Sequence, residues 1–579
     1  MINYQTLSFE YKPCAELQPG SEANVHPVVV VGAGPIGLAT AIDLAQRGVP
    51  VVVLDDDCTL STGSRAICFS KRTLDIFDRL GCAERMVEKG VSWNVGKVFL
   101  KDELVYTFNL LPESGHHRPA FINLQQYYLE GFLVERAQAF AQIDLRWKSC
   151  VTGIEQHGTP GSPDAGATLT VETPDGTYTL RARYVVAADG SRSPVRKLMG
   201  LDSHGRTFKD RFLIADVKME ADFPTERWFW FDPPFHPNQS VLLHRQPDNV
   251  WRIDFQLGWD ADPVLEKTPE RVIPRVRALL GPDAKFELEW VSVYTFSCLR
   301  MDSFRHGQVL FAGDSAHGVS PFGARGANSG VQDAENLAWK LAMVLEGRAT
   351  DALLDTYARE REYAADENIR NSTRSTDFIT PKSAVSRVFR DAVLTLARDH
   401  AFARQLVNSG RLSVPAVLHE SVLNTPDVER FAGQMMPGAA CCDAPVQVCG
   451  ESSSAAEVKG ASAWLLHWLG ESFTGLLFCG GVDRLDAQTQ SALQRIEQGA
   501  VPTKIVAVVS DGANVPEGLP SSAIVLRDVE GLAAARYDAT PGTFYLIRPD
   551  QHVCARWRHT DADRVESALK RALCVAGTA

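Results

Sequence analysis

The 579-residue sequence lacks the features that mark membrane, exported and nucleic-acid-binding proteins. No apolar run approaches the roughly 18 residues that a membrane helix needs. Charged residues such as Glu10 and Lys12 interrupt the segment where a signal core would lie. Basic runs are also absent, and the net charge is −12. We therefore expect a cytoplasmic protein with neither a nucleic-acid nor a membrane partner.

Cysteine motifs for metal binding or redox chemistry are missing as well. The twelve cysteines include no CxxC pair and no spacing that is typical of metal ligands. Scattered thiols fit a reducing compartment. We expect these cysteines to be packing residues, and we expect no metal site.

Periodicity divides the chain into segments of different character. Strand and helix signals alternate from 28 to about 85, which is typical of a parallel α/β layer. The stretch 145–190 predicts a hairpin around Pro174-Asp-Gly that leads into a buried strand. Residues 211–300 are rich in aromatic side chains and alternate as antiparallel strands do. Further expected elements are a helix at 329–346 and strands at 464–469, 476–478, 505–509 and 543–547.

The first chemical motif is a glycine-rich turn. Gly32, Gly34 and Gly37 follow a predicted strand at 28–31 and open a helix that begins at Pro35. Glycines at these positions permit a tight turn, a close approach to a pyrophosphate, and tight packing of helix on strand. The next predicted strand delivers Asp55, which can accept ribose hydroxyls. The set predicts a dinucleotide site, and either NAD or FAD fits it.

A second motif far downstream decides between these two nucleotides. Gly313 and Asp314 follow a predicted buried strand, and a loop from Pro321 to Gly330 then opens the long helix. The carboxylate can hold a second ribose or a ribityl hydroxyl. Backbone amides at the helix start can hold a polarised carbonyl or a pyrophosphate. A nucleotide site that both halves of the chain supply indicates a large, permanently held cofactor, which is FAD.

A third motif lies between the other two. Asp189, Gly190 and Arg192 stand at the end of a predicted strand, just before a short helix. The spacing fits a ligand site and a capped helix equally well.

In this order and at these distances, the three motifs resemble the single-component FAD-dependent aromatic hydroxylases, in particular the phenol and 3-(3-hydroxyphenyl)propionate hydroxylases. The resemblance covers roughly residues 26 to 400. It implies an α/β fold with a Rossmann-like FAD-binding domain of the para-hydroxybenzoate hydroxylase type and a mostly antiparallel substrate-domain sheet. It also implies a C-terminal thioredoxin-like domain, whose last hairpin is matched near 543–557.

The resemblance implies the following domain limits. The expected parts are an N-terminal arm at 1–25, a discontinuous FAD-binding domain at 26–200 and 301–408, a substrate-binding domain at 201–300 with part of 90–120, a linker at 409–435, and a thioredoxin-like domain without CxxC at 436–579.

The resemblance also carries FAD contacts onto matching positions of this sequence. Those positions are Gly32, Gly34, Pro35, Gly37, Asp55, Arg65, Gln126, Asp189, Arg192, Gly313, Asp314, Pro321, Gly326, Ala327 and Asn328. Gln125 is adjacent to Gln126, which leaves the register of that contact open. Arg325 is a departure, because many relatives carry a neutral residue there. It fits an anion-binding role and a structural role equally well.

The implied activity is NAD(P)H- and O2-dependent hydroxylation of a phenolic ring, ortho or para to its hydroxyl, through a flavin C4a-hydroperoxide. NADH or NADPH would visit as a transient reductant without a Rossmann domain of its own. His244, Tyr294 and Arg252 are candidates for positioning the phenol, and Gln256 is a further one. The aromatic side chains that could wall the pocket are Trp228, Trp230 and Phe255.

Two competing functions remain open at this point. One is an FAD-dependent oxidoreductase on the same fold that does not insert oxygen. The other is a non-catalytic FAD-binding or assembly protein. The identity of the phenol and the existence of a homodimer also stay open. His317 is expected to lie against the FAD without transferring a proton, and His116 and His117 are expected to be solvated in their loop.

Overall fold

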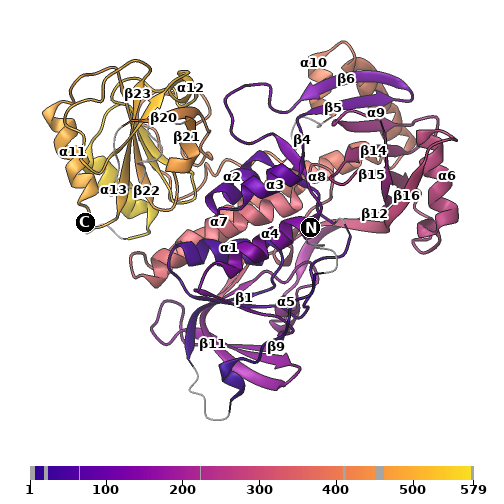
Figure 1. Ribbon diagram of the computed structural model, residues 1–579, viewed down its shortest axis with the longest axis horizontal. Helices are drawn as coiled ribbons and strands as arrows, with labels where there is room; N and C mark the ends of the chain where they lie inside the picture. Colours follow the sequence, from indigo (N-terminus) through magenta and orange to yellow (C-terminus); the bar gives the residue numbers. More distant parts are fainter. Residues whose placement is uncertain are drawn as a thin grey trace.

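The computed structural model describes residues 7–18, 24–63, 65–221, 223–407, 413–449 and 462–575. Figure 1 shows a central group of helices above one sheet, a second sheet to one side, and a C-terminal unit to the other side. Within the described ranges, no helix combines the length and apolar character needed to cross a membrane.

A parallel sheet brings the three sequence motifs to one edge. Its parallel strands lie in the order β18 (Val309–Phe311), β11 (Gly176–Ala187), β1 (Val25–Val31), β2 (Val51–Leu54) and β8 (Ile143–Arg146). Neighbouring parallel strands end on the same side of a sheet, so the loops after β1, β11 and β18 lie side by side. These loops carry the glycine turn, the Asp189 motif and the Asp314 motif.

The expected hairpin is confirmed on the same sheet. β10 (Gly166–Thr173) pairs antiparallel with the first part of β11, and Thr173 lies opposite Gly176 across the turn. β9 (Cys150–His157) extends this arm, and β17 (Arg305–His306) pairs with β18. The last residues of β11 leave the hairpin and pair with β1 and β18.

Helices cover this sheet and connect it to the rest of the chain. The long helix expected at 329–346 starts three residues earlier, as α7 (Gly326–Leu345). The glycine turn opens α1 (Pro35–Gln46), close to the expected limits. The other helices of this part are α2 (Lys71–Arg79), α3 (Ala83–Lys89), α4 (Gln126–Gln138), α5 (Pro194–Leu198), α8 (Ala352–Ile379), α9 (Ala384–Ala397) and α10 (Ala401–Leu406). Three short strands, β3 (Cys68–Ser70), β7 (Phe121–Asn123) and β4 (Val91–Trp93), form a small sheet beside them.

The second layer is mostly antiparallel, as expected from its alternating pattern. Its strand order is β19 (His317–Gly318), β16 (Phe286–Met301), β12 (Ser203–Met219), β15 (Val250–Leu257), β14 (Ser240–Arg245), β13 (Arg227–Phe231), β5 (Val95–Leu100) and β6 (Glu103–Asn109). One face packs with α6 (Pro269–Leu280) through Trp251, Ile253 and Phe255. The other face meets the start of α7, where Phe212 and Phe296 contact Phe322.

The C-terminal unit is built on a seven-stranded sheet. Its order is β21 (Ser462–Trp464), β20 (Pro445–Cys449), β24 (Ile524–Asp528), β23 (Thr503–Ser510), β22 (Phe473–Gly480), β25 (Phe544–Ile547) and β26 (Val553–Trp557), with helices α11 (Ala487–Glu497), α12 (Leu532–Arg536) and α13 (Ala562–Ala572). The strands expected at 476–478 and 505–509 lie within β22 and β23, and β25 matches the one expected at 543–547. The thioredoxin-like assignment stays a prediction.

The prediction of a strand at 464–469 is wrong. β21 ends at Trp464, and a short 3-10 helix, η6 (Leu465–Trp468), follows it. The Asp443 carboxylate accepts the backbone N–H of Leu466 at 3.1 Å, which stabilises this turn. A short apolar run has the same pattern in a buried strand and in a buried helical turn, so periodicity alone could not separate them.

The described part of the N-terminal arm packs on the first sheet. Phe9 donates its backbone N–H to Cys58, and its ring stacks on Trp147 with 4.4 Å between centroids. Glu16 pairs with Arg146 at 3.1 Å. Residues 1–6 and 19–23 lie outside the described part, and the domain limits themselves stay a prediction.

A buried charge network fixes the C-terminal unit to the helices. Arg548, in the turn between β25 and β26, donates to Glu360 of α8 at 2.6 and 3.0 Å. It also bonds to Asp550, whose Oδ2 accepts the Trp339 indole N–H of α7 at 3.1 Å. Lys340 of α7 pairs with the same Glu360 at 2.7 Å. Because these side chains are fully enclosed, each charge depends on its partners.

We predict that Arg548→Met weakens folding strongly, because it leaves the Glu360 and Asp550 charges buried with fewer partners. Loss of one member of a buried pair lowers the free energy of unfolding by about 3–5 kcal/mol. Urea unfolding followed by tryptophan fluorescence measures the change. The matched control is Arg495→Met, since Arg495 pairs with Asp563 at the surface and should leave the unfolding midpoint almost unchanged. Equal effects of the two substitutions would contradict the role of the network.

Candidate flavin and substrate site

The glycine turn after β1 is shaped by three glycines with two different roles. A Cβ on Gly32, whose φ is +105°, would lie 2.5 Å from the Ala188 carbonyl oxygen. A Cβ on Gly37 would clash with the carbonyl oxygen of Gly32. These two glycines are therefore required by packing. Gly34 differs, because a Cβ there would meet nothing within 4 Å. Gly34 precedes α1, and no side chain caps the start of this helix.

Asp55 stands where the sequence places it, at the end of β2. Its carboxylate accepts the backbone N–H groups of Ala33 at 2.6 Å and Asp57 at 2.9 Å. Burial raises the pKa of Asp55 to about 6, although these two hydrogen bonds oppose the shift. The ionised carboxylate therefore prevails above that pH, and it sits against the glycine turn ready to accept ribose hydroxyls.

The Asp314 motif is held in place by one buried carboxylate. Asp333 of α7 accepts the backbone N–H of Gly313 at 3.0 Å, the His317 ring at 2.6 Å and the Arg361 guanidinium at 2.6 Å. His317 is therefore engaged in fixing the turn. Asp314 itself has an exposed side chain with no hydrogen bond to any other described residue, so its carboxylate is free to bind a hydroxyl group.

The Asp189 motif serves as a helix cap and also offers a free oxygen. Its Oδ2 accepts the backbone N–H of Val195 at 2.9 Å, at the start of α5. Its Oδ1 is buried and has no partner among the described residues, and burial raises the pKa of this carboxyl. Arg192 is exposed. Arg196 of α5 donates to the Ser315 and Ser191 carbonyls at 2.7 Å and so connects the Asp189 motif to the Asp314 motif.

The two adjacent glutamines at the start of α4 point to different places. The Gln126 Oε1 accepts the backbone N–H of Ala66 at 3.0 Å, so it supports the loop that carries Arg65. Gln125 instead donates to the Pro247 carbonyl. Of the two glutamines, Gln126 therefore contacts the loop that carries Arg65. The Arg65 side chain itself is exposed.

The loop before α7 joins the first sheet to the second. Pro321 is exposed, and Phe322 packs between the rings of the second sheet. The Asn328 side chain bonds to the backbone of Ser70 and Cys68 at 2.8 and 2.9 Å. No side chain caps α7, so the amides of Gly326, Ala327 and Asn328 remain for a ligand. Arg325 is buried, with its guanidinium against Gly323.

These observations fit FAD. The open space at Gly34 suits a pyrophosphate at the start of α1. The carboxylates of Asp55, Asp189 and Asp314 provide acceptors for hydroxyl groups along the same edge of the sheet. The uncapped start of α7 suits the polar edge of a flavin ring.

The structure brings the three candidate phenol-positioning residues onto one face of the second sheet. His244 on β14 lies directly opposite Arg252 on β15. Tyr294 lies on the same face of the sheet, on β16, two strands beyond Arg252. Arg252 forms a salt bridge with Asp216 at 2.9 Å and donates to the Arg65 carbonyl at 3.3 Å. Burial, reinforced by the carboxylate of Asp254, holds the pKa of Tyr294 well above its usual value.

The three aromatic side chains expected to wall the pocket face the other way. Trp228, Trp230 and Phe255 pack into the core against α6. Because side chains alternate along a strand, they lie on the face opposite His244. The rings that adjoin the polar face are instead Phe212 and Phe322.

Several buried polar atoms on this face have no hydrogen-bond partner among the described residues. They are the Nδ1 of His244, the Nε of Arg227 and the Oδ1 of Asp254, whereas the His244 Nε2 lies 3.3 Å from the Asp254 Oδ2. Burial, and then the positive charge of Arg227, lower the pKa of His244 to about 4, so its ring is neutral at pH 7. Arg227 contacts the Cys68 thiol at 3.6 Å and has no acidic partner in the described ranges.

Sequence reasoning missed Arg227 and Asp254. The alternation of side chains along 227–231 and 251–257 would have placed both on the polar face, had the register between the strands been known. A buried polar atom without a partner needs an explanation, and a bound ligand supplies one.

Comparison with known proteins shows to which family and which fold the chain belongs. Residues 25–372 match a family model described as FAD binding domain. The chain is 34% identical over 351 residues to a probable NADH-specific resorcinol 4-hydroxylase of Rhodococcus jostii, which covers 59% of this chain and 64% of that protein. It is 29% identical over 567 residues to a 3-(3-hydroxy-phenyl)propionate/3-hydroxycinnamic acid hydroxylase of Paraburkholderia xenovorans, covering 91% and 88%. The first of these matches spans less than two thirds of the relative's length.

Solved structures show the same fold over almost the whole chain. The flavin-dependent monooxygenase PieE, in complex with FAD and substrate, superposes with a TM-score of 0.77 at 21% identity, covering 96% of this chain and all of that one. Aklavinone-11 hydroxylase, in a ternary complex with FAD and aklavinone, gives a TM-score of 0.72 at 25% identity, covering 95% of this chain and all of that one.

We predict that Gly34→Ala leaves the apoprotein folded but weakens FAD binding. The added methyl group meets no protein atom, yet it occupies the space that a pyrophosphate would need. Affinity should fall roughly tenfold or more, which corresponds to about 1.4 kcal/mol. Titration of apoprotein by quenching of flavin fluorescence measures this. Gly258→Ala is the matched control, since a Cβ on Gly258 also meets nothing within 4 Å but lies just after β15, in the other layer. Unchanged FAD affinity in Gly34→Ala would contradict the assigned phosphate position.

Proposed function

Because the chain belongs to the family of FAD-dependent aromatic hydroxylases, whose FAD-binding domain matches residues 25–372, we propose that it uses NADH or NADPH and dioxygen to hydroxylate a phenolic ring. The new hydroxyl would enter ortho or para to the existing one. Reduced FAD supplies the activation of dioxygen, which protein side chains cannot provide.

The residues proposed to hold FAD come from loops and helix starts that lie far apart in the sequence. Gly32, Gly34, Pro35, Gly37, Asp55, Arg65, Gln126, Asp189, Arg192, Gly313, Asp314, Pro321, Gly326, Ala327 and Asn328 form this set. Their support is the convergence of the loops after β1, β11 and β18, together with two uncapped helix starts.

One observation carries the proposed substrate position. The buried Nδ1 of His244 and Nε of Arg227, which have no partner among the described residues, lie on the sheet face that meets Phe322, next to the start of α7. A phenol oxygen there would satisfy polar atoms whose burial is otherwise unfavourable. The aromatic ring would then lie between the polar face and the flavin edge.

Each polar side chain then has a distinct task. The guanidinium of Arg227 favours the phenolate over the phenol, and the negative charge of the phenolate makes the ring a better nucleophile. The Nε2 of the neutral His244 ring lies beside Asp254, so its Nδ1 can accept the O–H of the phenol. Tyr294 stays protonated and can donate. Arg252 is held by Asp216 and positions the Arg65 loop.

The names of the relatives bear on the substrate class. The Rhodococcus jostii protein is named for resorcinol, and a Pseudomonas relative with 29% identity for para-nitrophenol. Both are phenols with a single ring, and we propose the same class here. NADH is the reductant in the name of the first relative, and it is the first one to test.

The proposed function is tested with a panel of single-ring phenols. The purified holoenzyme should oxidise NADH or NADPH faster when its own phenol is present. Under labelled dioxygen, the product should carry one labelled oxygen atom. Substrate-stimulated oxidation with an unlabelled product would favour an oxidoreductase that does not insert oxygen. If NAD(P)H together with the tested phenols leaves the flavin absorption unbleached, the result would favour a non-catalytic FAD protein.

We predict that Arg227→Gln and His244→Asn each lower kcat/KM for the phenol by roughly 10- to 100-fold, which corresponds to a lost charge-assisted hydrogen bond of about 1.5–3 kcal/mol. Arg227→Gln should also raise the pKa of the bound phenol, measured by its ultraviolet spectrum. Arg245→Gln is the control, because its side chain packs on Trp251 on the other face of the sheet. An equal loss in the control, or an unshifted phenol pKa, would contradict these roles.

A further inference from the structure

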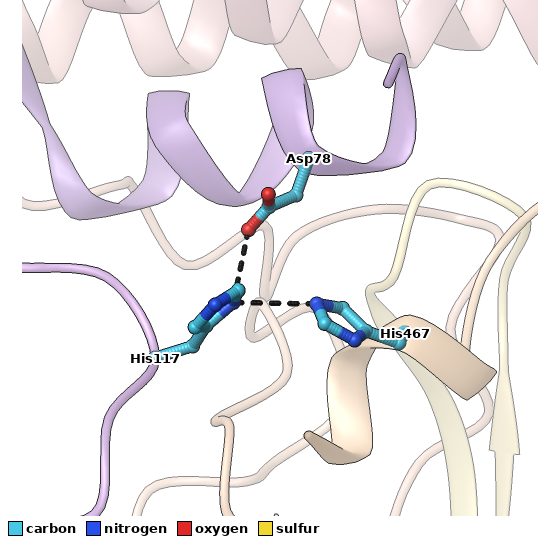
Figure 2. A group of neighbouring side chains, drawn as sticks. All are labelled: Asp78, His117 and His467. Atoms are coloured by element: carbon cyan, nitrogen blue, oxygen red, sulfur yellow. Dashed lines mark hydrogen bonds and ion pairs between the residues drawn. The ribbon is translucent and has the colours of Figure 1, made fainter. Parts of the chain in front are cut away.

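Three side chains from distant parts of the sequence converge where the C-terminal unit meets the flavin-binding body. Asp78 comes from α2, His117 from the loop at 110–118, and His467 from η6 (Figure 2). The His117 Nδ1 lies 3.3 Å from the Asp78 Oδ2 and 3.2 Å from the His467 Nε2. The three ligand atoms all lie within 4.8 Å of one another.

Hydrogen bonds alone do not satisfy this arrangement, because a single nitrogen faces both neighbours. If the His117 Nδ1 carries a proton, it can donate to Asp78 or to His467, but not well to both. If it carries none, it accepts from His467 and then sets its lone pair against the Asp78 oxygen. A cation placed between the three atoms would accept a lone pair from each.

Two of the three distances between the ligand atoms match those of a metal coordination shell. Zn²⁺ binds histidine nitrogens and carboxylate oxygens at about 2.0–2.2 Å with tetrahedral geometry, which sets neighbouring ligand atoms roughly 3.4 Å apart. The two separations at the His117 Nδ1 are within about 0.2 Å of that value. We propose that Asp78, His117 and His467 bind one divalent transition-metal ion, with Zn²⁺ the best fit, and that this ion joins the C-terminal unit to the flavin-binding body.

A hydrogen bond holds the Asp78 carboxylate in place for a metal. Arg118 donates its Nε to the Asp78 Oδ2 at 2.6 Å, which fixes the carboxylate and leaves it further lone pairs.

Charge and ring orientation also favour a bound cation. Arg118 is paired with both Asp78 and Glu84, so these three side chains together carry a single negative charge. The His117 ring stacks on Trp464 with 5.1 Å between centroids, which fixes its plane. His467 is exposed, so water can reach a fourth coordination position.

Other contacts show that the loop and the C-terminal unit already lie against each other. Arg536 donates to the carbonyl oxygens of Gly115 and Ser114 at 2.7 and 2.6 Å. The backbone N–H of His117 donates to Asp443 at 3.3 Å. His116 and His117 were expected to be solvated, but both are half-buried in this interface. The metal would therefore reinforce an existing junction.

Metal uptake by the full-length holoenzyme tests the proposal without using its activity. Protein freed of metal with a chelator is titrated with Co²⁺, whose visible absorption reports tetrahedral coordination, and with Zn²⁺ by calorimetry. Wild type should bind one equivalent at micromolar protein and melt at a higher temperature when Zn²⁺ is present. His467→Ala and Asp78→Asn should lose the tight equivalent and the thermal shift.

The control is His204→Ala, because His204 is exposed and also lies near a carboxylate, Asp302. It should bind metal as wild type does. His467 is itself exposed, so its replacement should leave the apoprotein folded, and the melting temperature without metal checks this. The proposal is overturned if wild type binds no more metal than His467→Ala, or if His204→Ala loses the same equivalent.

Discussion

The flavin-binding body depends on a tight contact made by Ile36, in the first turn of α1. A Cβ on Gly313 would lie 2.7 Å from the Ile36 Cγ1, and a Cβ on Gly330 would lie 2.8 Å from it. Neither position accepts a larger residue unless the helices separate. Segments almost 300 residues apart are therefore held together, and the loops after three neighbouring parallel strands lie at one edge of the sheet.

The same long helix links this contact to the C-terminal unit. The N-terminal end of α7 has no side-chain cap, and Asp333 of this helix fixes the Gly313 turn. Further along, Trp339 and Lys340 enter the buried charge network that holds the β25–β26 turn. Since the charges of that network have no access to water, the C-terminal unit cannot move without exposing or unpairing them. Flavin site and C-terminal unit thus share one rigid support.

Local motifs made much of this arrangement predictable. The glycine turn, Asp55 and the hairpin around Pro174 depend on backbone geometry that neighbouring residues encode, and the structure has each where it was expected. Which face of a strand a side chain occupies depends on partners far away. For that reason Trp228 was misplaced and Arg227 was missed. Asp78, His117 and His467 share no sequence pattern at all, since only the contact between two units brings them together.

The central claim is that both halves of the chain hold one FAD. Hydrogen–deuterium exchange of the apoprotein, with and without FAD, tests it most directly. We predict that added FAD slows exchange in the glycine turn at 32–38 and, in the same titration, at 313–330. Protection that stays confined to 32–38 at saturating FAD would contradict the account, because it would mean that the downstream loop does not contact the cofactor.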